Sequence, residues 1–520
     1  MKVPYRCLYN HELLILFTSQ TPYQTYKEPV GDAQVIGCVE ELKDQGVDAL
    51  MICPQAWRTN LWHSEIDRRW QDDAPKEKEP LLESDLKYWQ KAYFRVRRYM
   101  LEGKDPVALT IKTARENGIA PLFSYRMNDH HFTNNPEGAT HSRFWKEHPE
   151  YWLHPNGAPF NYLHAKVREH YLSIFGELLE RYDVEGFECD FMRSAWYFPK
   201  GRVEEGTELM TGLVRALRAK LDAVGQARGK KLALSVRVPA SLQLCRETGL
   251  DVARWAREGL LDMINATTSF RLSQEVDIGG FREAAPEVAL YGELHFVSQP
   301  GETFGGYRTS INRLTTPELY RSTALSFLDR GADGVSLFNF AYSRDHSFNE
   351  VRRKHFPGVE PPFHVLSSLR DRATLKQGSQ HLSLTPDVGN ALCRPAGSLP
   401  KAIRGLESGK FEIHVPDVLD SPFQSAILRI EAESPVAHLP FAASINGVKL
   451  EGILRHGELF EPWSLEVMPD PLHLHHFKVK PSDLRTGYNA IEIFNHWMTS
   501  GGGAFSGKVT LVRIDLALYR

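Results

Sequence analysis

The chain has 520 residues, of which 42% are hydrophobic and 24% are charged, and its formal net charge is -3. A chain of this length exceeds one ordinary core, so we expect two domains. The near-neutral charge offers no basic stripe to phosphate backbones, which argues against a nucleic-acid partner. No apolar run approaches the roughly 18 residues that cross a bilayer, and the early run Leu13–Phe17 is shorter than a signal-peptide core. We therefore expect no membrane association and a cytoplasmic location for the chain as given; a secreted chain trimmed of its signal would look the same.

Six cysteines stand singly, at positions 7, 38, 53, 189, 245 and 393. They have neither the close pairs of a zinc site nor the density of a disulfide scaffold. The neighbouring residues Asp129, His130, His131 and His141 lack the HExxH-type spacing of a helical zinc site. We expect buried, reduced cysteines, and neither a metal nor another cofactor.

In chain order, the first two thirds alternate short β-rich apolar runs with amphipathic helical patterns, which is typical of βαβ units. The predicted helices lie near 32–45, 106–117, 164–182, 204–223, 250–258 and 316–331. The predicted strands are Leu13–Phe17, Ala49–Cys53, Ala120–Tyr125, Gly186–Phe191, Leu232–Val238, Leu261–Ala266, Val288–Phe296 and Gly334–Phe340. Eight repeats favour a closed (β/α)8 TIM barrel of the α/β class, over residues 1–375, with long insertions at 54–104 and 127–163.

The fourth predicted strand carries two carboxylates two residues apart, Glu188 and Asp190, after the helix at 164–182. In a strand this spacing points both side chains to the same side. An unpaired buried carboxylate costs several kcal/mol, so two of them in a buried strand indicate a site.

Other polar residues also follow predicted strands, and barrel enzymes build their sites at that face. Carboxylate and amide oxygens accept hydrogen bonds from sugar hydroxyls, arginine donates in a fixed fork, and aromatic faces stack on sugar rings. We therefore expect a carbohydrate substrate. The predicted binding residues are Arg126, Asn128, Asp129, His130, Arg193, Arg237, Asn265, His295, Asn339, Trp57, Trp62 and Trp196.

Cleavage of a glycosidic bond commonly uses two carboxyl groups. Asp190 on strand four and Glu293 on strand seven would supply them from two sides of a barrel mouth. We favour Asp190 as nucleophile or charge stabiliser, Glu293 as acid/base and Glu188 in an orienting role. A separation of about 5–5.5 Å between the reacting carboxyls would mean a retaining reaction and about 6.5–9.5 Å an inverting one; a retaining reaction is the prediction.

From about residue 376 to 520, apolar and polar residues alternate with Pro, Gly and Asn turns, which predicts an antiparallel β-sandwich. The expected strands are Ser425–Ala432, Phe441–Leu450, His473–Val479, Ala490–Phe494 and Lys508–Leu518. The run from Asp483 to Ile493 resembles a strand entry of galactose-binding-like jelly rolls. Such a domain could bind glycan, cap the barrel or mediate a homo-oligomer.

Three segments resemble uncharacterised glycoside-hydrolase-like barrels: Asn161-Tyr162-Leu163-His164, the run Arg181-Tyr182-Asp183-Val184-Glu185-Gly186, and Asp190-Phe191-Met192-Arg193. Arg126-Met127-Asn128-Asp129 shares this likeness. The resemblance implies a carbohydrate-active barrel without naming the sugar. The Asn-Glu-Pro of many retaining barrel hydrolases is absent, whereas barrels with a strand-four Asp nucleophile, such as α-galactosidase and amylase types, look similar from Gly186 to Phe191.

Alternatives remain open on the sequence alone. Asp190 or Glu293 could pair with an arginine such as Arg237 in a structural ion pair, and Trp57 and Trp62 could only anchor their loops. As a whole, the chain could be a non-catalytic carbohydrate-binding protein that has lost one acid. A weaker alternative is a metal-dependent hydrolase or lyase that uses Asp129, His130 and His295.

Overall fold

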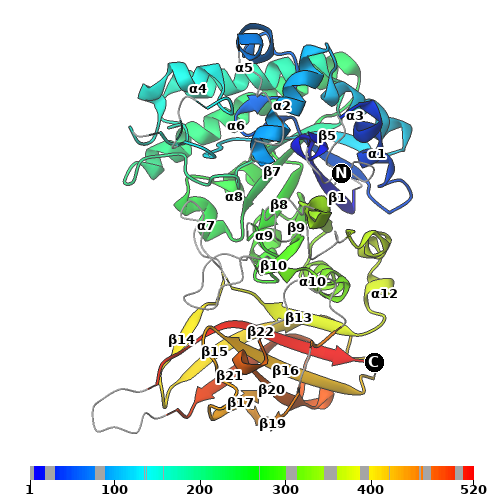
Figure 1. Cartoon of the computed structure of the whole chain (residues 1–520), viewed down its shortest axis with the longest axis vertical. Helices are drawn as coiled ribbons and strands as arrows, with labels where there is room; N and C mark the ends of the chain where they lie inside the picture. The colour runs from blue at the N-terminus through cyan, green and yellow to red at the C-terminus, as the bar shows by residue number, and fades with distance from the viewer. Residues whose placement is uncertain are drawn as a thin grey trace. The chain divides into compact units, whose positions relative to one another are not determined.

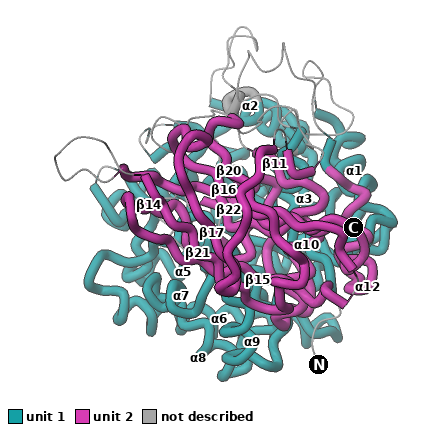
Figure 2. Tube along the Cα trace, turned by 90° about the horizontal axis from the view of Figure 1, so that it is seen from below, with its two compact units in different colours: residues 1–267, 277–291, 336–361 teal, residues 268–276, 292–335, 362–520 magenta. Residues whose placement is uncertain are grey.

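The computed structural model describes most of the chain (Figure 1). The chain forms two compact units (Figure 2). Unit 1 comprises residues 1–267, 277–291 and 336–361, and unit 2 comprises residues 268–276, 292–335 and 362–520. The domain boundary at residue 375 stays a prediction. The described residues are 5–17, 30–76, 88–133, 135, 138–155, 157–268, 270–299, 313–344, 360–386, 397–420, 422–455, 458–460, 470–497 and 507–520.

Eight parallel strands close into a barrel, which confirms the predicted fold class. Their order around the barrel is β1-β12-β9-β8-β7-β6-β5-β2. Neighbouring barrel strands are therefore consecutive in the chain, and the last strand, β12, closes against the first, β1, as in a (β/α)8 fold. The strands are β1 (Cys7–Glu12), β2 (Ala49–Cys53), β5 (Ala120–Arg126), β6 (Gly186–Asp190), β7 (Ala233–Pro239), β8 (Met263–Thr267), β9 (Ala289–His295) and β12 (Gly334–Phe338).

The first predicted strand, Leu13–Phe17, is wrong. The strand is β1 (Cys7–Glu12), which pairs with β2 from Leu8 opposite Ala49 to Glu12 opposite Cys53. Leu13–Phe17 forms the 3-10 helix η1 that follows it. The prediction from apolar runs favoured Leu13–Phe17, because the real strand ends in three buried polar residues, Asn10, His11 and Glu12.

Helices follow most barrel strands, and their ends match simple capping rules. The side chain of Asp105 caps α3, with Pro106 in its first turn, and α6 ends at Gly229 in the left-handed conformation, as expected. The sequence missed α2, which lies in the first insertion. The helices are α1 (Asp32–Glu40), α2 (Tyr88–Leu101), α3 (Pro106–Glu116), α4 (Arg143–Glu147), α5 (Ala165–Arg181), α6 (Val203–Arg228), α7 (Leu242–Glu247), α8 (Val252–Arg257), α9 (Ile278–Ala284), α10 (Pro317–Asp329) and α12 (Arg372–Leu375).

Short elements fill the remaining connections. In the first insertion, β3 (Gln55–Ala56) pairs with β4 (Thr59–Asn60) before the π-helical turn η2 (Arg69–Asp73) and the 3-10 turn η3 (Ala74–Lys76). Elsewhere β10 (Val297–Gln299) pairs with β11 (Arg313–Leu314). The other 3-10 turns are η5 (Pro149–Tyr151), η6 (Phe340–Arg344), η7 (Phe363–Arg370), η8 (Pro471–His473) and η9 (Pro481–Asp483).

The barrel interior is apolar where its strands begin. One buried cluster contains Leu8, Ala49, Met51, Leu122, Ala233, Met263, Ala289 and Tyr291. Because side chains alternate along a strand, residues two and four positions further on lie on the same face of their strand. On β5, β6 and β7 these are Ser124 and Arg126, Glu188 and Asp190, and Ser235 and Arg237. The interior therefore changes from apolar to polar toward the carboxyl ends of these strands.

Gly186 begins β6, where a side chain would have no space. A Cβ atom built there would lie 2.5 Å from the carbonyl oxygen of Ala233 and 2.9 Å from a methyl carbon of Leu122. We predict that Gly186→Ala lowers the free energy of unfolding by about 1–3 kcal/mol, because the barrel must shift to relieve overpacking.

Urea unfolding would measure the effect of Gly186→Ala. The matched control is Gly212→Ala in α6, where a Cβ would contact nothing within 4 Å and where alanine favours the helix by about 1 kcal/mol. Equal stability of the two variants would contradict the prediction.

The C-terminal part of unit 2 is an all-β region, as predicted. A six-stranded antiparallel sheet runs β13-β22-β16-β20-β19 with β14 paired to β22, and a four-stranded sheet runs β15-β21-β17-β18. The bounds are β13 (Gln380–Leu384), β14 (Lys401–Ile403), β15 (Ser408–Val415), β16 (Ser425–Ala432), β17 (Phe441–Ile445), β18 (Val448–Lys449), β19 (Glu451–Ile453), β20 (Leu474–Val479), β21 (Gly487–Asn495) and β22 (Val509–Tyr519).

The six-stranded sheet buries charge on one of its faces. Arg429 on β16 lies opposite Asp515 on β22, and Arg513 lies two residues before Asp515 on the same face. Leu428 and Leu516, one residue away, belong to the opposite, apolar face. All of these side chains are buried, so the sheet is covered on both faces.

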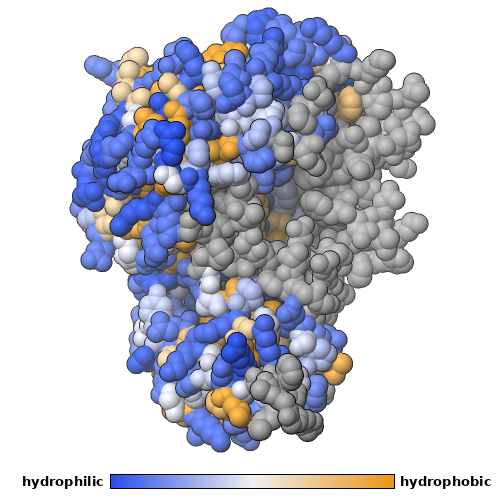
Figure 3. All heavy atoms as spheres, turned by 90° about the vertical axis from the view of Figure 1, so that its left-hand side faces the viewer, coloured by the Kyte–Doolittle hydropathy of each residue, from blue (hydrophilic) through white to orange (hydrophobic). Residues whose placement is uncertain are grey.

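On the face shown in Figure 3, hydrophobic side chains are scattered among hydrophilic ones. Among the described residues, no helix combines the length and the apolar character that a bilayer span requires. Cys7, Cys38, Cys53, Cys189 and Cys245 are buried free thiols, as predicted; Cys393 lies outside the described residues.

Candidate active site

Strand register places polar side chains of neighbouring strands at two levels of the barrel. At one level Glu188 lies between Ser124 on β5 and Ser235 on β7. At the next level, Asp190 lies between Arg126 and Arg237, and Asn265 on β8 lies opposite Arg237. The upper level is thus built from two arginines, a carboxylate and an amide at the carboxyl ends of consecutive strands.

Asp190 is held on one side only. Its Oδ1 accepts hydrogen bonds from Nη1 of Arg237 at 2.9 Å and from the backbone N–H of Met192 at 2.8 Å. Arg237 in turn lies over the ring of Phe338, with its guanidinium carbon 3.9 Å from the centroid, a favourable cation–π contact. Among the described residues, none donates a hydrogen bond to Oδ2 of Asp190, so one carboxylate oxygen is left for another group.

Glu188 is satisfied by its neighbours. Its two oxygens accept from the hydroxyls of Ser124 at 2.7 Å and Ser235 at 2.9 Å. Burial is the main cause that raises the pKa of Glu188 to about 7, and the nearby charge of Asp190 adds to it, while the serine hydrogen bonds and Arg237 oppose it. Glu188 therefore carries a proton much further toward neutral pH than an exposed glutamate, and its contacts favour a supporting role.

The raised pKa of Glu188 makes stability depend on pH. The folded state binds the proton more tightly than the unfolded state, so the stabilisation is present below about pH 4.5 and is lost as pH rises through about 7. A shift of this size corresponds to about 3 kcal/mol. We predict that Glu188→Gln, which is neutral and of the same shape, removes this loss.

Urea unfolding of wild type and Glu188→Gln at pH 5 and pH 8 would test this prediction. The wild type should lose stability between the two values relative to the variant. Parallel changes in both proteins would contradict a raised pKa of Glu188.

A second group of charges joins β1, β5 and the loop after β5. Nη2 of Arg126 lies 2.5 Å from Oε1 of Glu12, and Nη1 of Arg126 lies 3.5 Å from Oδ2 of Asp129. The hydroxyl of Tyr342 donates to the other oxygen of Glu12 at 2.7 Å. Glu12 and Arg126 are both buried, so each compensates a charge that would otherwise be costly.

The carboxylates of this group are held ionised. Burial raises the pKa of Glu12, but the charges of Arg126 and Arg193 and the Tyr342 hydroxyl outweigh it and lower the pKa overall. For Asp129, burial is likewise outweighed, by its hydrogen bond with His131 and by the charges of Arg193 and Arg126, so its pKa lies well below the ordinary value. The group is therefore a permanently charged network near neutral pH.

The histidines of the loop after β5 complete this network. Nδ1 of His131 lies 2.7 Å from Oδ1 of Asp129, and Nε2 of His131 lies 2.8 Å from Nη2 of Arg193. His130 bonds instead to the hydroxyl of Ser194. Burial lowers the pKa of both imidazoles, that of His130 to about 4, so His130 is neutral at pH 7. The adjacent histidines therefore have different partners.

Several predicted binding residues bond to other loops of the barrel or to a helix. Asn128 donates to the carbonyls of Phe160 and Trp196 and accepts from the N–H of Phe160. Trp57 and Trp62 are buried, and Nε1 of Trp62 donates to Glu177 on α5. The burial and contacts of Trp57 and Trp62 favour the loop-anchoring alternative for these two residues, and the amide of Asn128 is occupied by the backbone of the same loops. Trp196 is partly exposed and donates from Nε1 to the carbonyl of Phe198.

The remaining predicted residues fall in both units. In unit 1, Asn265 donates to the hydroxyl of Ser336, and buried Asn339 follows β12 with a left-handed φ of 53°. Such conformations are costly for non-glycine residues and cluster at functional sites. Glu293 and His295 belong to unit 2; they lie on the same face of β9 as Tyr291 and are buried. The pairing of Asp190 with Glu293 stays a proposal.

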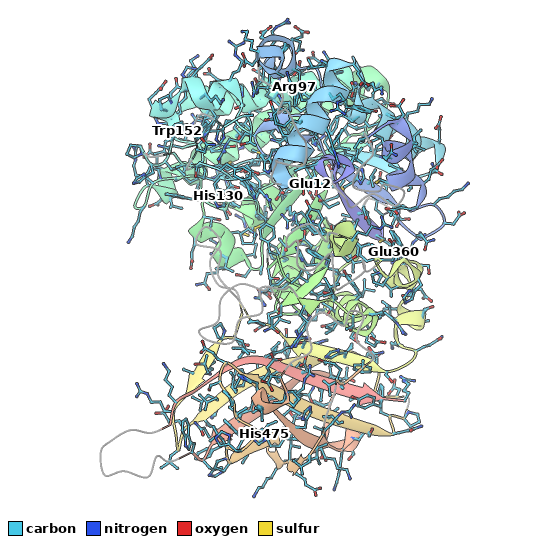
Figure 4. All side chains as sticks on the ribbon, in the orientation of Figure 1. Glu12, Arg97, His130, Trp152, Glu360 and His475 are labelled. Carbon is cyan, nitrogen blue, oxygen red and sulfur yellow. The ribbon has the colours of Figure 1, made fainter. Side chains whose placement is uncertain are left out.

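Sequence reasoning missed Glu12, Tyr342, Ser124 and Ser235 as partners of the charged groups. Placing the first strand at Leu13–Phe17 instead of Cys7–Glu12 hid Glu12, although a buried Asn-His-Glu at the end of a short β-rich run is a usable signal. The serines could have been found from alternation with Glu188 on neighbouring strands. Figure 4 labels Glu12 on β1 and His130 on the loop after β5. Among the described residues, no three His, Cys, Asp or Glu side chains are arranged to hold a metal.

The fold and these side chains define a (β/α)8 barrel protein with a polar, charged interior at the carboxyl ends of its strands. No family model and no curated protein matches the chain. Among solved structures, it is similar to a chitinase from a Paenibacillus species (12% identity, 96% of this chain, 53% of that chain, TM-score 0.40) and to α-L-fucosidase isoenzyme 2 from Paenibacillus thiaminolyticus (11%, 74%, 52%, 0.41). A family GH18 chitinase from Chromobacterium violaceum is similar at 11% identity, over 99% of this chain and 88% of that chain, with a TM-score of 0.40. The chain thus spans about half the length of the first two. At these identities and TM-scores the likenesses carry no argument about activity.

Proposed function

We propose that the protein is a glycoside hydrolase whose chemistry takes place at the carboxyl end of β6. The observation that carries the proposal is Asp190, a buried carboxylate at a strand end. It is oriented through Oδ1 by Arg237 and a backbone N–H, and no described residue donates to Oδ2, which we propose to face the substrate. Barrel enzymes place their reacting groups at this face. A fixed carboxylate suits stabilisation of, or attack on, the positively charged anomeric carbon of a glycosidic transition state.

Hydrolysis needs a second carboxyl group that protonates the leaving oxygen. Glu293 is the proposed acid/base, because it follows the same alternation along β9 that places Glu188 and Asp190 along β6. Glu188 is proposed to support Asp190 from one level below, since both of its oxygens are already bonded to serines. A retaining reaction is proposed, which requires a separation of about 5–5.5 Å between the two reacting carboxyls.

The surrounding groups suit a substrate rich in hydroxyls. Asn265 has amide and carbonyl functions, and Arg193, which is partly exposed, donates in a fork. Uncharged sugars are bound by such mixed donors and acceptors together with aromatic rings. No cofactor is required by this chemistry, and the C-terminal sheets are proposed to serve as a glycan-binding, structural or oligomer-forming part of the protein.

A non-catalytic carbohydrate-binding protein is the second candidate. It is favoured by the close ion pair between Asp190 and Arg237, which reduces the reactivity of the carboxylate. Both candidates are expected to bind glycan, but only the hydrolase is expected to release sugar from it.

The test is incubation of the purified protein with an arrayed set of aryl-glycosides and plant and marine oligosaccharides. Released reducing sugar or phenol supports the hydrolase. Glycan binding without release over the whole set, with the fold intact by circular dichroism, would overturn the hydrolase and support the binding protein. Loss of an observed activity on treatment with a chelator, restored by zinc or manganese, would instead support the metal-dependent alternative.

A further inference from the structure

A small cavity lies beside the charged network, within unit 1. Its volume is about 20 Å³, and its lining comes from the first insertion, the end of β5, the loop that follows and helix α5. Arg58, Arg126 and Asp129 are among the lining residues. A cavity of roughly 10–15 Å³ or more, measured in this way, holds one water molecule. The space is therefore large enough for one small molecule and too small for a sugar.

Three buried polar atoms on this lining lack a hydrogen-bond partner among the described residues. They are Nη2 of Arg58, Nη1 of Arg126 and Oδ2 of Asp129. The three side chains are 8%, 2% and 3% exposed, respectively. The 3.5 Å contact between Nη1 of Arg126 and Oδ2 of Asp129 is longer than a good hydrogen bond. Buried polar groups of this kind are normally satisfied, so all three indicate a common partner.

The chemistry of the three atoms selects that partner. Two guanidinium N–H groups require an acceptor, which disfavours a cation. The Asp129 carboxylate requires a donor, which disfavours a halide or another anion. Water accepts two hydrogen bonds and donates two, and buried waters typically make about three bonds to otherwise unsatisfied groups.

We propose that this cavity is a specific binding site for a single water molecule that bridges Arg58, Arg126 and Asp129. Nothing in this inference depends on the proposed glycosidase activity. The bridge makes Arg58 a positioning residue for Asp129, and through it for His131 and Arg126 at the barrel mouth.

Arg58 is itself fixed by contacts of its guanidinium group. Its Nη1 donates to the carbonyl of His131 at 2.8 Å and lies 2.9 Å from Nδ1 of His141. Its guanidinium carbon lies 4.7 Å from the centroid of the Trp145 ring. Arg58 therefore joins the first insertion to the loop after β5, and the water extends this connection to the Asp129 carboxylate.

Crystal structures of the full chain, determined with sodium chloride and again after a sodium bromide soak, test the proposal. We expect one peak within hydrogen-bond distance of all three atoms, without anomalous bromine signal. We further expect Arg58→Lys, which keeps a cationic donor, to retain the peak and the 2.7 Å contact between Asp129 and His131. Arg58→Met, which is apolar, should lose or displace the peak and lengthen that contact.

Three outcomes would overturn the proposal. A bromine signal in the cavity would identify an anion site, an empty cavity in the wild type would exclude any bound molecule, and an unchanged peak in Arg58→Met would show that Arg58 is no partner. If Arg58→Met fails to fold, the two wild-type data sets still decide between water, anion and no ligand.

Discussion

Replacing Asp190 by asparagine is expected to reduce glycosidic turnover by a factor on the order of 10⁴ or more, while the fold survives. The amide keeps the size of the carboxylate and can still accept from Arg237 through its oxygen, so the barrel packing is preserved. It carries no negative charge, however, and it neither attacks nor stabilises the developing positive charge at the anomeric carbon. The measurement is released reducing sugar on a glycoside that the wild type cleaves.

The matched control for this experiment is Asp183→Asn. Asp183 lies in the same helix–strand unit, so Asp183→Asn is the same chemical change. Asp183 precedes β6, however, and its side chain is 57% exposed and paired with Lys230. Near-normal activity is expected for the control. Wild-type turnover in Asp190→Asn would remove Asp190 from the chemistry, and equal loss in both variants would indicate a folding defect instead.

Removal of Asp515 is the second change with a large expected effect, and it concerns stability. Oδ2 of Asp515 accepts from Nη2 of Arg429 at 2.7 Å, and Oδ1 accepts from Nε of Arg513 at 2.9 Å and lies 3.1 Å from Nε2 of His381. The side chain is fully buried. Asp515→Ala removes the carboxylate that pairs with the buried Arg513 and leaves Arg429 with Glu458 alone; removing one partner of a buried ion pair typically costs about 3–5 kcal/mol. Urea unfolding should show a correspondingly lower stability of unit 2.

Asp420→Ala is the control for Asp515→Ala, because Asp420 is exposed and surface substitutions usually change stability by less than about 0.5 kcal/mol. Comparable unfolding midpoints for the two variants would show that the Asp515 network contributes little. The double variant Arg429→Met with Asp515→Leu, which removes two opposite charges, should recover part of the loss, since apolar replacement of buried ion pairs is often well tolerated.

Much of the fold could be read from pattern, because the elements follow local rules. The helix α5 (Ala165–Arg181) matches the range 164–182 predicted from its apolar spacing, and β2 matches Ala49–Cys53. The strand β16 likewise matches Ser425–Ala432. The apolar spacing of α5 is helical, whereas β2 and β16 are short runs whose length and β-forming residues favour strands.

The elements that pattern missed depend on the barrel as a whole. Leu13–Phe17 is more apolar than Cys7–Glu12, yet the latter is the strand: it pairs with β2, and its last residue, Glu12, meets Arg126. A prediction from apolar runs does not recognise a polar strand residue whose partner lies more than a hundred positions away in the chain. The same limit explains why Ser124 and Ser235 were not connected with Glu188.

The sequence by itself determined that a barrel and an antiparallel β region exist and that Glu188 and Asp190 share a face of one strand, since these follow from alternation and helical spacing. Only the tertiary structure decided what those carboxylates contact. Both oxygens of Glu188 bond to serines, whereas Asp190 is fixed through Oδ1 by Arg237 and receives no bond at Oδ2 from the part of the chain that the structure describes. The physical reason is register. Strand pairing sets which residues stand at the same level of a barrel. Hydrogen bonds and charges across strands then decide how strongly Glu188 holds its proton and which carboxylate oxygens have partners.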